Sequence, residues 1–197
     1  MSSTYIVRHA ESEFNVAYVD KERDPKIFDP VLTECGIAQS KRLGEELANL
    51  QPDLIVSSPL TRALQTAHVA SNGRWPIVAM AGLREKQFNS CDVGTPKSEL
   101  AARFPSVNLS MIDEIWWYAG DHREFPVSRE PVSTFLDRVA DFRTHLIQQI
   151  TEGSARVVYF GHQTFFESLV GQTLGNCQMM ALDQVEALFD MPAIKGV

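Results

Sequence analysis

The sequence contains no apolar run long enough to cross a bilayer, because about 20 consecutive apolar residues are needed and no run comes near that length. It also has no basic segment followed by an apolar core near its N-terminus, so we expect no signal peptide. These two absences exclude a membrane-spanning protein and favour a cytoplasmic location.

Cysteine and positive charge are also scarce. The three cysteines, Cys35, Cys91 and Cys177, are far apart and form no CxxC pair, which argues against a disulfide framework or a zinc site. The net charge of −7 disfavours binding to nucleic acid or to an anionic membrane. If the protein binds an anion, it must do so through a local cluster of basic residues.

The alternation of apolar runs and amphipathic segments predicts the fold class. Short apolar runs predict buried strands near residues 5–7, 53–58, 76–80 and 155–160. Strands that alternate with helices favour an α/β fold, a three-layer α/β/α sandwich with a mostly parallel central sheet and helices on both faces. The length of 197 residues suits one domain, so we expect residues 1–197 to form a single unit.

Capping residues and apolar spacing predict the helices. One helix is expected from an N-cap at Thr33 to about residue 49, and another from Ser58 and Pro59 as N-cap and first residue. Further helices are predicted at about 97–104, at 132–150, and from a capping box at residues 164 and 167 to a stop at Gly175. The tail after residue 179 is ambiguous, with 185–189 either a short edge strand or the end of a helix.

Residues 87–131 interrupt this pattern. Four prolines and the run Trp116-Trp117-Tyr118 predict an excursion that leaves the sheet, returns, and partly covers the site. The aromatic run has two interpretations: it stacks on an apolar part of a substrate, or it anchors the cover to the core.

Basic side chains follow three of the predicted strands. Arg8 and His9 end the first strand, Arg62 lies in the first turn of the helix after the second, off its buried face, and His162 follows the last. Ligands of open α/β sheets bind beyond the carboxyl ends of the strands, so these groups are expected to converge there. Two guanidinium groups and two imidazoles suit a phosphate dianion.

Other chemistries fit these residues less well. A metal site using His9 and His162 is opposed by the charge of the arginines, and no carboxylate has obvious ligand spacing to either histidine. Ser12 and Ser57 lie near the site, but there is no nucleophile elbow. No cysteine falls at a strand-to-helix junction, which disfavours a cysteine–histidine nucleophile.

Five segments together resemble the histidine phosphatase (phosphoglycerate-mutase-like) superfamily. They occur in the family's order and are RHAESEFN at 8–15, LTECGIAQ at 32–39, VSSPLTRALQTA at 56–67, LRE at 83–85 and FGH at 160–162. The chain departs from the family pattern at Ala10 and at Gln163, where glycine is common. Ala10 can alter the backbone behind the nucleophile, and Gln163 can instead place an amide donor in the pocket.

The resemblance implies a role for each site residue. His9 would be the nucleophile that forms a phosphohistidine, and Arg8, Arg62 and His162 would neutralise the transferring phosphoryl group. Asn15 would donate a further hydrogen bond to the phosphate. Glu85 would protonate the leaving alcohol and then activate water. From the sequence around it alone, Glu85 reads as a surface glutamate.

The same resemblance suggests a branch of the family. Related mutases carry ERHYG just after the proton donor, whereas residues 85–94 here read EKQFNSCDVG, which is more similar to the phosphatases. The sequence therefore predicts a phosphomonoesterase with a small phosphorylated substrate and no metal or cofactor. A phosphoglycerate mutase and a non-catalytic module that binds a phosphorylated ligand remain the alternatives. Lys97, Arg123 and Arg129 are candidates for contact with a second anionic group.

Overall fold

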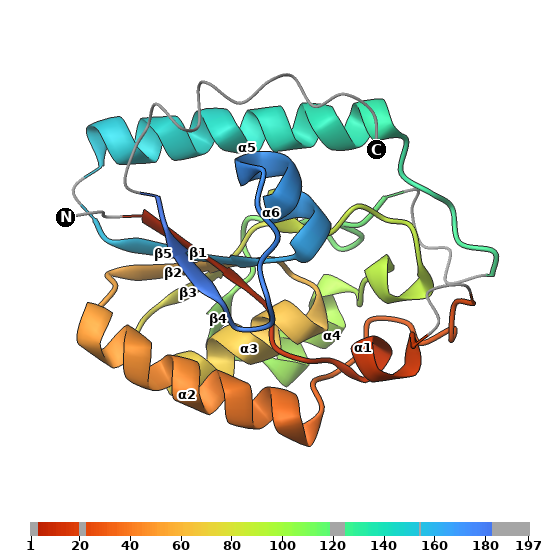
Figure 1. The fold of residues 1–197 in the computed structure, drawn as a ribbon, viewed down its shortest axis with the longest axis horizontal. Helices are drawn as coiled ribbons and strands as arrows, with labels where there is room; N and C mark the ends of the chain where they lie inside the picture. Colours follow the sequence, from red (N-terminus) through yellow and green to blue (C-terminus); the bar gives the residue numbers. More distant parts are fainter. Residues whose placement is uncertain (1–3, 20–22, 119–124, 154, 183–197) are drawn as a thin grey trace.

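The computed structural model describes residues 4–19, 23–118, 125–153 and 155–182 and shows a twisted sheet between two layers of helices (Figure 1). The strands are β1 (Thr4–Arg8), β2 (Leu54–Ser57), β3 (Ile77–Ala79), β4 (Val107–Asn108), β5 (Val157–Gly161) and β6 (Met179–Ala181). The helices are α1 (Glu13–Ala17), α2 (Glu34–Leu50), α3 (Thr61–Ser71), α4 (Lys97–Arg103), α5 (Val132–Glu152) and α6 (Gln163–Val170), with 3₁₀ turns η1 (Ala81–Leu83) and η2 (Ser90–Asp92).

The six strands form one sheet in the order β4-β3-β2-β5-β1-β6. All neighbours are parallel except β6, which pairs with β1 in the antiparallel sense. The predicted α/β sandwich with a mostly parallel sheet is therefore confirmed. None of the helices in the described ranges has the length and apolar character required to cross a bilayer.

Alternate residues of the strands supply two separate cores. In β5, Val158 and Phe160 pack on the side of α2 and α3, whereas Val157 and Tyr159 pack on the side of α5 and α6. Figure 1 shows these helix pairs on opposite faces of the sheet. Since both faces are covered, every residue of β5 is buried, which is why the strand reads as a continuous apolar run.

The start of α2 agrees with the prediction, whereas the start of α3 differs from it. The expected N-cap at Thr33 is confirmed, since its hydroxyl accepts the N–H of Gly36. The helix predicted from Ser58 begins later, at Thr61, because the distant carboxylate of Asp29 accepts the Thr61 N–H at 2.8 Å and its hydroxyl at 2.7 Å.

Helix α6 also differs at both of its ends. The predicted capping box of Thr164 and Glu167 is not formed, because the Thr164 N–H donates to Glu85 from another part of the chain. The helix stops before Gly171, which has a φ of 71°, and not at Gly175.

The segment predicted to leave the sheet contributes its edge strand. Val107 and Asn108 of β4 pair with β3, and two residues are too few to show an alternating pattern. Trp116 and Trp117 are each 5% exposed and meet edge to face, and the Trp116 Nε1–H donates to the Thr95 carbonyl. Both indoles belong to the core on the α2 and α3 side, so they anchor this segment. Residues 185–189 and Arg123 lie outside the described residues.

Candidate active site

His9 comes directly after β1 and is fixed by its backbone. Its N–H donates to the Gly161 carbonyl of β5, and its ring is only 4% exposed. The ring Nδ1 lies 2.7 Å from the Ala10 carbonyl, which can only accept, so the proton is on Nδ1 and the lone pair is on Nε2. Burial, and then the charge of Arg62, hold the pKa of His9 well below 6.5, which favours the neutral ring.

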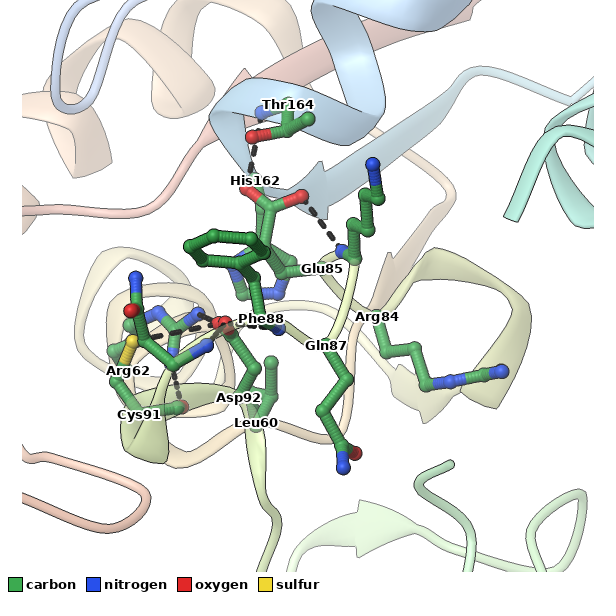
Figure 2. A network of polar contacts seen from close by, with 12 residues as sticks. Leu60, Arg62, Arg84, Glu85, Gln87, Phe88, Cys91, Asp92, His162 and Thr164 are labelled. Carbon is green, nitrogen blue, oxygen red and sulfur yellow. Dashed lines mark hydrogen bonds and ion pairs between the residues drawn. The ribbon is translucent and has the colours of Figure 1, made fainter. Parts of the chain in front are cut away.

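Arg62 lies in the first turn of α3 and meets this ring. Its Nε–H lies 3.3 Å from His9 Nε2, and its two Nη atoms bind the Cys91 carbonyl and, at 3.1 Å, the Asp92 carboxylate (Figure 2). The prediction that Arg62 is off the buried face is wrong, because its side chain is only 4% exposed. It is buried by polar groups of the site, which the apolar stripe of the helix cannot reveal.

His162 follows β5 and, unlike His9, has no exposed surface. The two ring centroids are 5.1 Å apart, and His162 Nε2 is 2.8 Å from the Ser58 hydroxyl at the end of β2. Burial, followed by the charge of Arg62, lowers the pKa of His162 well below its usual value. Its Nδ1 has no hydrogen-bond partner among the described residues.

Arg8, the last residue of β1, completes the basic group. Its Nη1 donates to the Leu174 carbonyl at 2.8 Å, while its buried Nε has no partner within the described part of the chain. The sheet order places β2, β5 and β1 side by side, so the four basic side chains predicted at three strand ends do converge. Arg8 and Arg62 supply the positive charge of this group, because the lowered pKa values of both histidines favour their neutral forms.

A cavity of about 930 Å³ opens over these groups. Every predicted site residue except His162 lines it, namely Arg8, His9, Asn15, Arg62, Glu85 and Gln163. Asn15 also closes a capping box with Ser12 at the start of α1, and Gln163 is the first residue of α6. A second hollow, of about 950 Å³ between α2 and α3, is lined by none of these residues.

Glu85 reaches the cavity from the loop after η1, and α6 holds its carboxylate. Its Oε2 accepts the Thr164 N–H at 2.9 Å, and its Oε1 accepts those of Lys86 and Phe165 (Figure 2). These bonds favour the charged form, but burial and the nearby charge of Asp92 outweigh them and raise the pKa of Glu85. A carboxyl group with a raised pKa is suited to donating a proton.

Sequence reasoning missed two residues that contact the basic groups. Asp92 is buried and pairs with Arg62, and its other oxygen accepts the N–H groups of Phe88 and Asn89. It follows no strand and belongs to no periodic pattern, so the sequence gives no signal for it. Ser58 does follow a strand, and the strand-end argument applied to His162 would have found it.

The sequence matches the model of the histidine phosphatase superfamily (branch 1) over residues 4–187. The chain belongs to the histidine phosphatase superfamily. A glucosyl-3-phosphoglycerate phosphatase from Mycolicibacterium vanbaalenii is 31% identical over 177 residues, which cover 86% of this chain and 73% of that protein. A 2,3-bisphosphoglycerate-dependent phosphoglycerate mutase from Leifsonia xyli is 34% identical over 110 residues, 50% of this chain and 40% of that protein.

The share of each relative that the chain covers differs from one relative to another. The chain spans 59% of the Bacillus subtilis phosphatase PhoE, to which it is 29% identical over 119 residues. The ecdysone phosphate phosphatase of Bombix mori, solved with tungstate, superposes with a TM-score of 0.63 at 16% identity, covering 89% of this chain and 86% of that one. At that identity the likeness shows the fold alone.

Proposed function

We propose that the protein is a phosphomonoesterase that hydrolyses a small phosphorylated metabolite through a phosphohistidine on His9. One observation carries this proposal: residues far apart in the chain meet at His9, whose Nε2 lies 3.3 Å from Arg62 at the floor of the cavity and whose ring centroid lies 5.1 Å from that of the buried His162. A neutral imidazole with its lone pair on Nε2 is a nucleophile, and fixed cations beside it favour a phosphoryl group.

In the first step, His9 Nε2 attacks phosphorus and the bond from phosphorus to the ester oxygen breaks. The bonding electron pair goes to the leaving oxygen, which takes a proton from Glu85. Arg8 and Arg62 neutralise the non-bridging oxygens, and His162 stabilises them from behind His9. Asn15 and Gln163 donate further hydrogen bonds from the cavity wall.

In the second step, Glu85 is charged and removes a proton from water. The water oxygen attacks phosphorus, the bond from phosphorus to Nε2 breaks, and the electron pair returns to His9. The products are inorganic phosphate and an enzyme in its starting state. This cycle uses only side chains of the chain and balances without a metal or cofactor.

A phosphatase is preferred to a mutase because of residues 85–94. Mutases that resemble this chain carry the segment ERHYG just after the proton donor. This chain reads EKQFN at that place. The curated relatives include both activities, so the assay must distinguish them.

A panel of phosphorylated metabolites should be scored for release of inorganic phosphate, with the wild type compared with His9→Ala. We expect release that falls by about 10⁴-fold or more in the variant. A mutase would instead interconvert 3- and 2-phosphoglycerate when primed with a bisphosphate. Binding of phosphorylated ligands without turnover by the wild type would leave only the non-catalytic module.

A further inference from the structure

The cavity is much larger than a phosphate group, and its polarity changes with depth. Its floor holds His9 and Arg62, which are 4% and 3% exposed, whereas Phe88 on the wall is 44% exposed. The phosphoryl group therefore occupies the deep end, and the alcohol portion of the substrate extends toward the mouth.

Aromatic and apolar side chains also line the cavity. Phe14 and Tyr18, whose ring centroids are 5.0 Å apart, come from the start of the chain, and Pro131 and Val132 come from the start of α5. Phe88 lies between the Glu85 carboxylate and the Arg62–Asp92 pair in the view of Figure 2.

Two cations, Arg129 and Lys86, line the cavity, and the Lys86 Nζ lies 5.6 Å from the centroid of the Phe135 ring. The Arg129 guanidinium lies 4.0 Å from the centroid of the Phe88 ring and is exposed, and Lys86 lines the cavity next to Glu85. Neither cation pairs with a carboxylate within the described residues. Besides Glu85, the carboxylates of Asp92 and Glu130 line the cavity.

Those two carboxylates are already neutralised. Asp92 pairs with Arg62, and Glu130 pairs with both Arg84 and Arg138. Within the described residues, the charges of Lys86 and Arg129 are thus not balanced by a carboxylate. A substrate that brings its own negative charge to this position gains ion pairs without losing existing ones.

We propose that the substrate is a phosphate monoester whose alcohol portion is an aromatic or similarly flat apolar group that carries a carboxylate or another anion. The flat portion packs against Phe88 and Tyr18, and the anion meets Arg129 and Lys86 at the rim. The inference rests on the proposed function only for the position of the phosphoryl group. Trp116 and Trp117, buried in the core, take no part.

Matched ligands test this assignment. The probes are 3-carboxyphenyl phosphate, its uncharged counterpart 3-carbamoylphenyl phosphate, and propyl phosphate, which lacks the ring. The corresponding phosphonates, which cannot be hydrolysed, are used for binding by calorimetry. The variants are Arg129→Gln with Lys86→Gln, Phe88→Leu, and Lys41→Gln on α2 as the control.

For the wild type we expect a preference of about five- to tenfold for the carboxylate over the carboxamide in kcat/KM, arising in KM. The preference should weaken as ionic strength rises. The double variant should abolish it, Phe88→Leu should reduce the advantage of both aryl esters over propyl phosphate, and Lys41→Gln should change neither.

Equal use of the two aryl esters by the wild type, or a preference retained in the double variant, would overturn the inference. The phosphonates separate failure of this inference from failure of the proposed function. If no ester is hydrolysed but the carboxyphenyl phosphonate binds more tightly than the carbamoyl compound, the hydrolase proposal fails and the rim assignment stands. Equal binding of the two phosphonates refutes the assignment whatever the turnover.

Discussion

The contact of His9 with Arg62 defines the chemistry at the scale of single residues. The Arg62 Nε–H, 3.3 Å from His9 Nε2, donates to the lone pair of that nitrogen and fixes the orientation of the ring. Neighbouring guanidinium groups favour the neutral form of an imidazole. In the structure, burial contributes more to the lowered pKa than either arginine does.

The pKa shifts of His9 and Glu85 predict the pH dependence of turnover. The proposed mechanism requires neutral His9 and protonated Glu85. The pKa of His9 is lowered, so the acidic limb of kcat/KM should lie well below pH 6.5. The pKa of Glu85 is raised, so the rate should fall with rising pH only above the range of an ordinary glutamate.

Glu85→Gln provides the test of this assignment. The variant should lose the alkaline limb of the pH profile and lower kcat by about 10²–10⁴-fold for an alkyl phosphate. For p-nitrophenyl phosphate the loss in the first step should be small, because its leaving group needs no proton. Equal losses for both esters in single-turnover measurements of phosphoryl transfer would remove Glu85 from the role of acid.

Asp92 is predicted to be a positioning residue that acts through Arg62 and Glu85. Its charge raises the pKa of Glu85 and its oxygen holds an Arg62 Nη atom. Asp92→Asn should therefore shift the alkaline limb to lower pH and reduce kcat/KM by about 10- to 100-fold. The exposed Asp141→Asn on α5 serves as the control and should change neither. A lower rate with an unmoved pH profile would leave Asp92 only a structural role.

At the scale of elements, the strands and their ends were the most predictable part of the molecule. Buried parallel strands read as apolar runs, and the residues that follow them meet at one edge, so Arg8, His9 and His162 were placed from local pattern alone. Glu85 was placed by family resemblance. Its surroundings, Thr164 and Asp92, come from distant parts of the chain and leave no local signature.

The errors in helix boundaries have the same cause. Asp29 caps α3 and Glu85 caps α6, and both are too far away in sequence to be paired by inspection. Likewise β4 is recognisable only by its pairing with β3. Local chemistry predicts an element well when its partners lie within one turn, and poorly when tertiary contacts replace them.

The cover over the site is fixed by close packing at Gly94. A Cβ atom there would lie 2.4 Å from a ring atom of Trp116, whereas at Gly82 the nearest atom would be 3.8 Å away. Gly94→Ala should destabilise the protein by about 1–3 kcal/mol, since the buried indole cannot move aside. Gly82→Ala is the matched control and should have little effect. Urea unfolding distinguishes them, and equal midpoints would show that the indole yields.

For the whole molecule, Glu130 joins the ends of the cover to the body. Its carboxylate has no exposed surface and pairs with Arg84 at 2.9 Å and Arg138 at 2.7 Å. Its backbone N–H donates to the Gln87 carbonyl at 2.8 Å. The two limits of the excursion, predicted from composition at 87 and 131, thus meet in space.

Glu130→Gln should cost about 3 kcal/mol of unfolding free energy, because two partly buried guanidinium groups lose their counter-charge. Glu99→Gln is the control, since its pair with Arg103 is 4.0 Å long and half exposed, and it should cost less than about 0.5 kcal/mol. Similar unfolding midpoints for the two variants would mean that this ion-pair network does not stabilise the fold.

The most direct test of the central claim is to trap the covalent intermediate. Wild-type protein is mixed with a phosphorylated substrate, quenched in base, where phosphohistidine is stable, and digested for mass spectrometry. The account predicts one added phosphoryl group on the peptide that contains His9, formed and lost at rates consistent with turnover and absent in His9→Ala. Turnover with no phosphorylated His9 peptide at any time point, or with the group on His162, would contradict it.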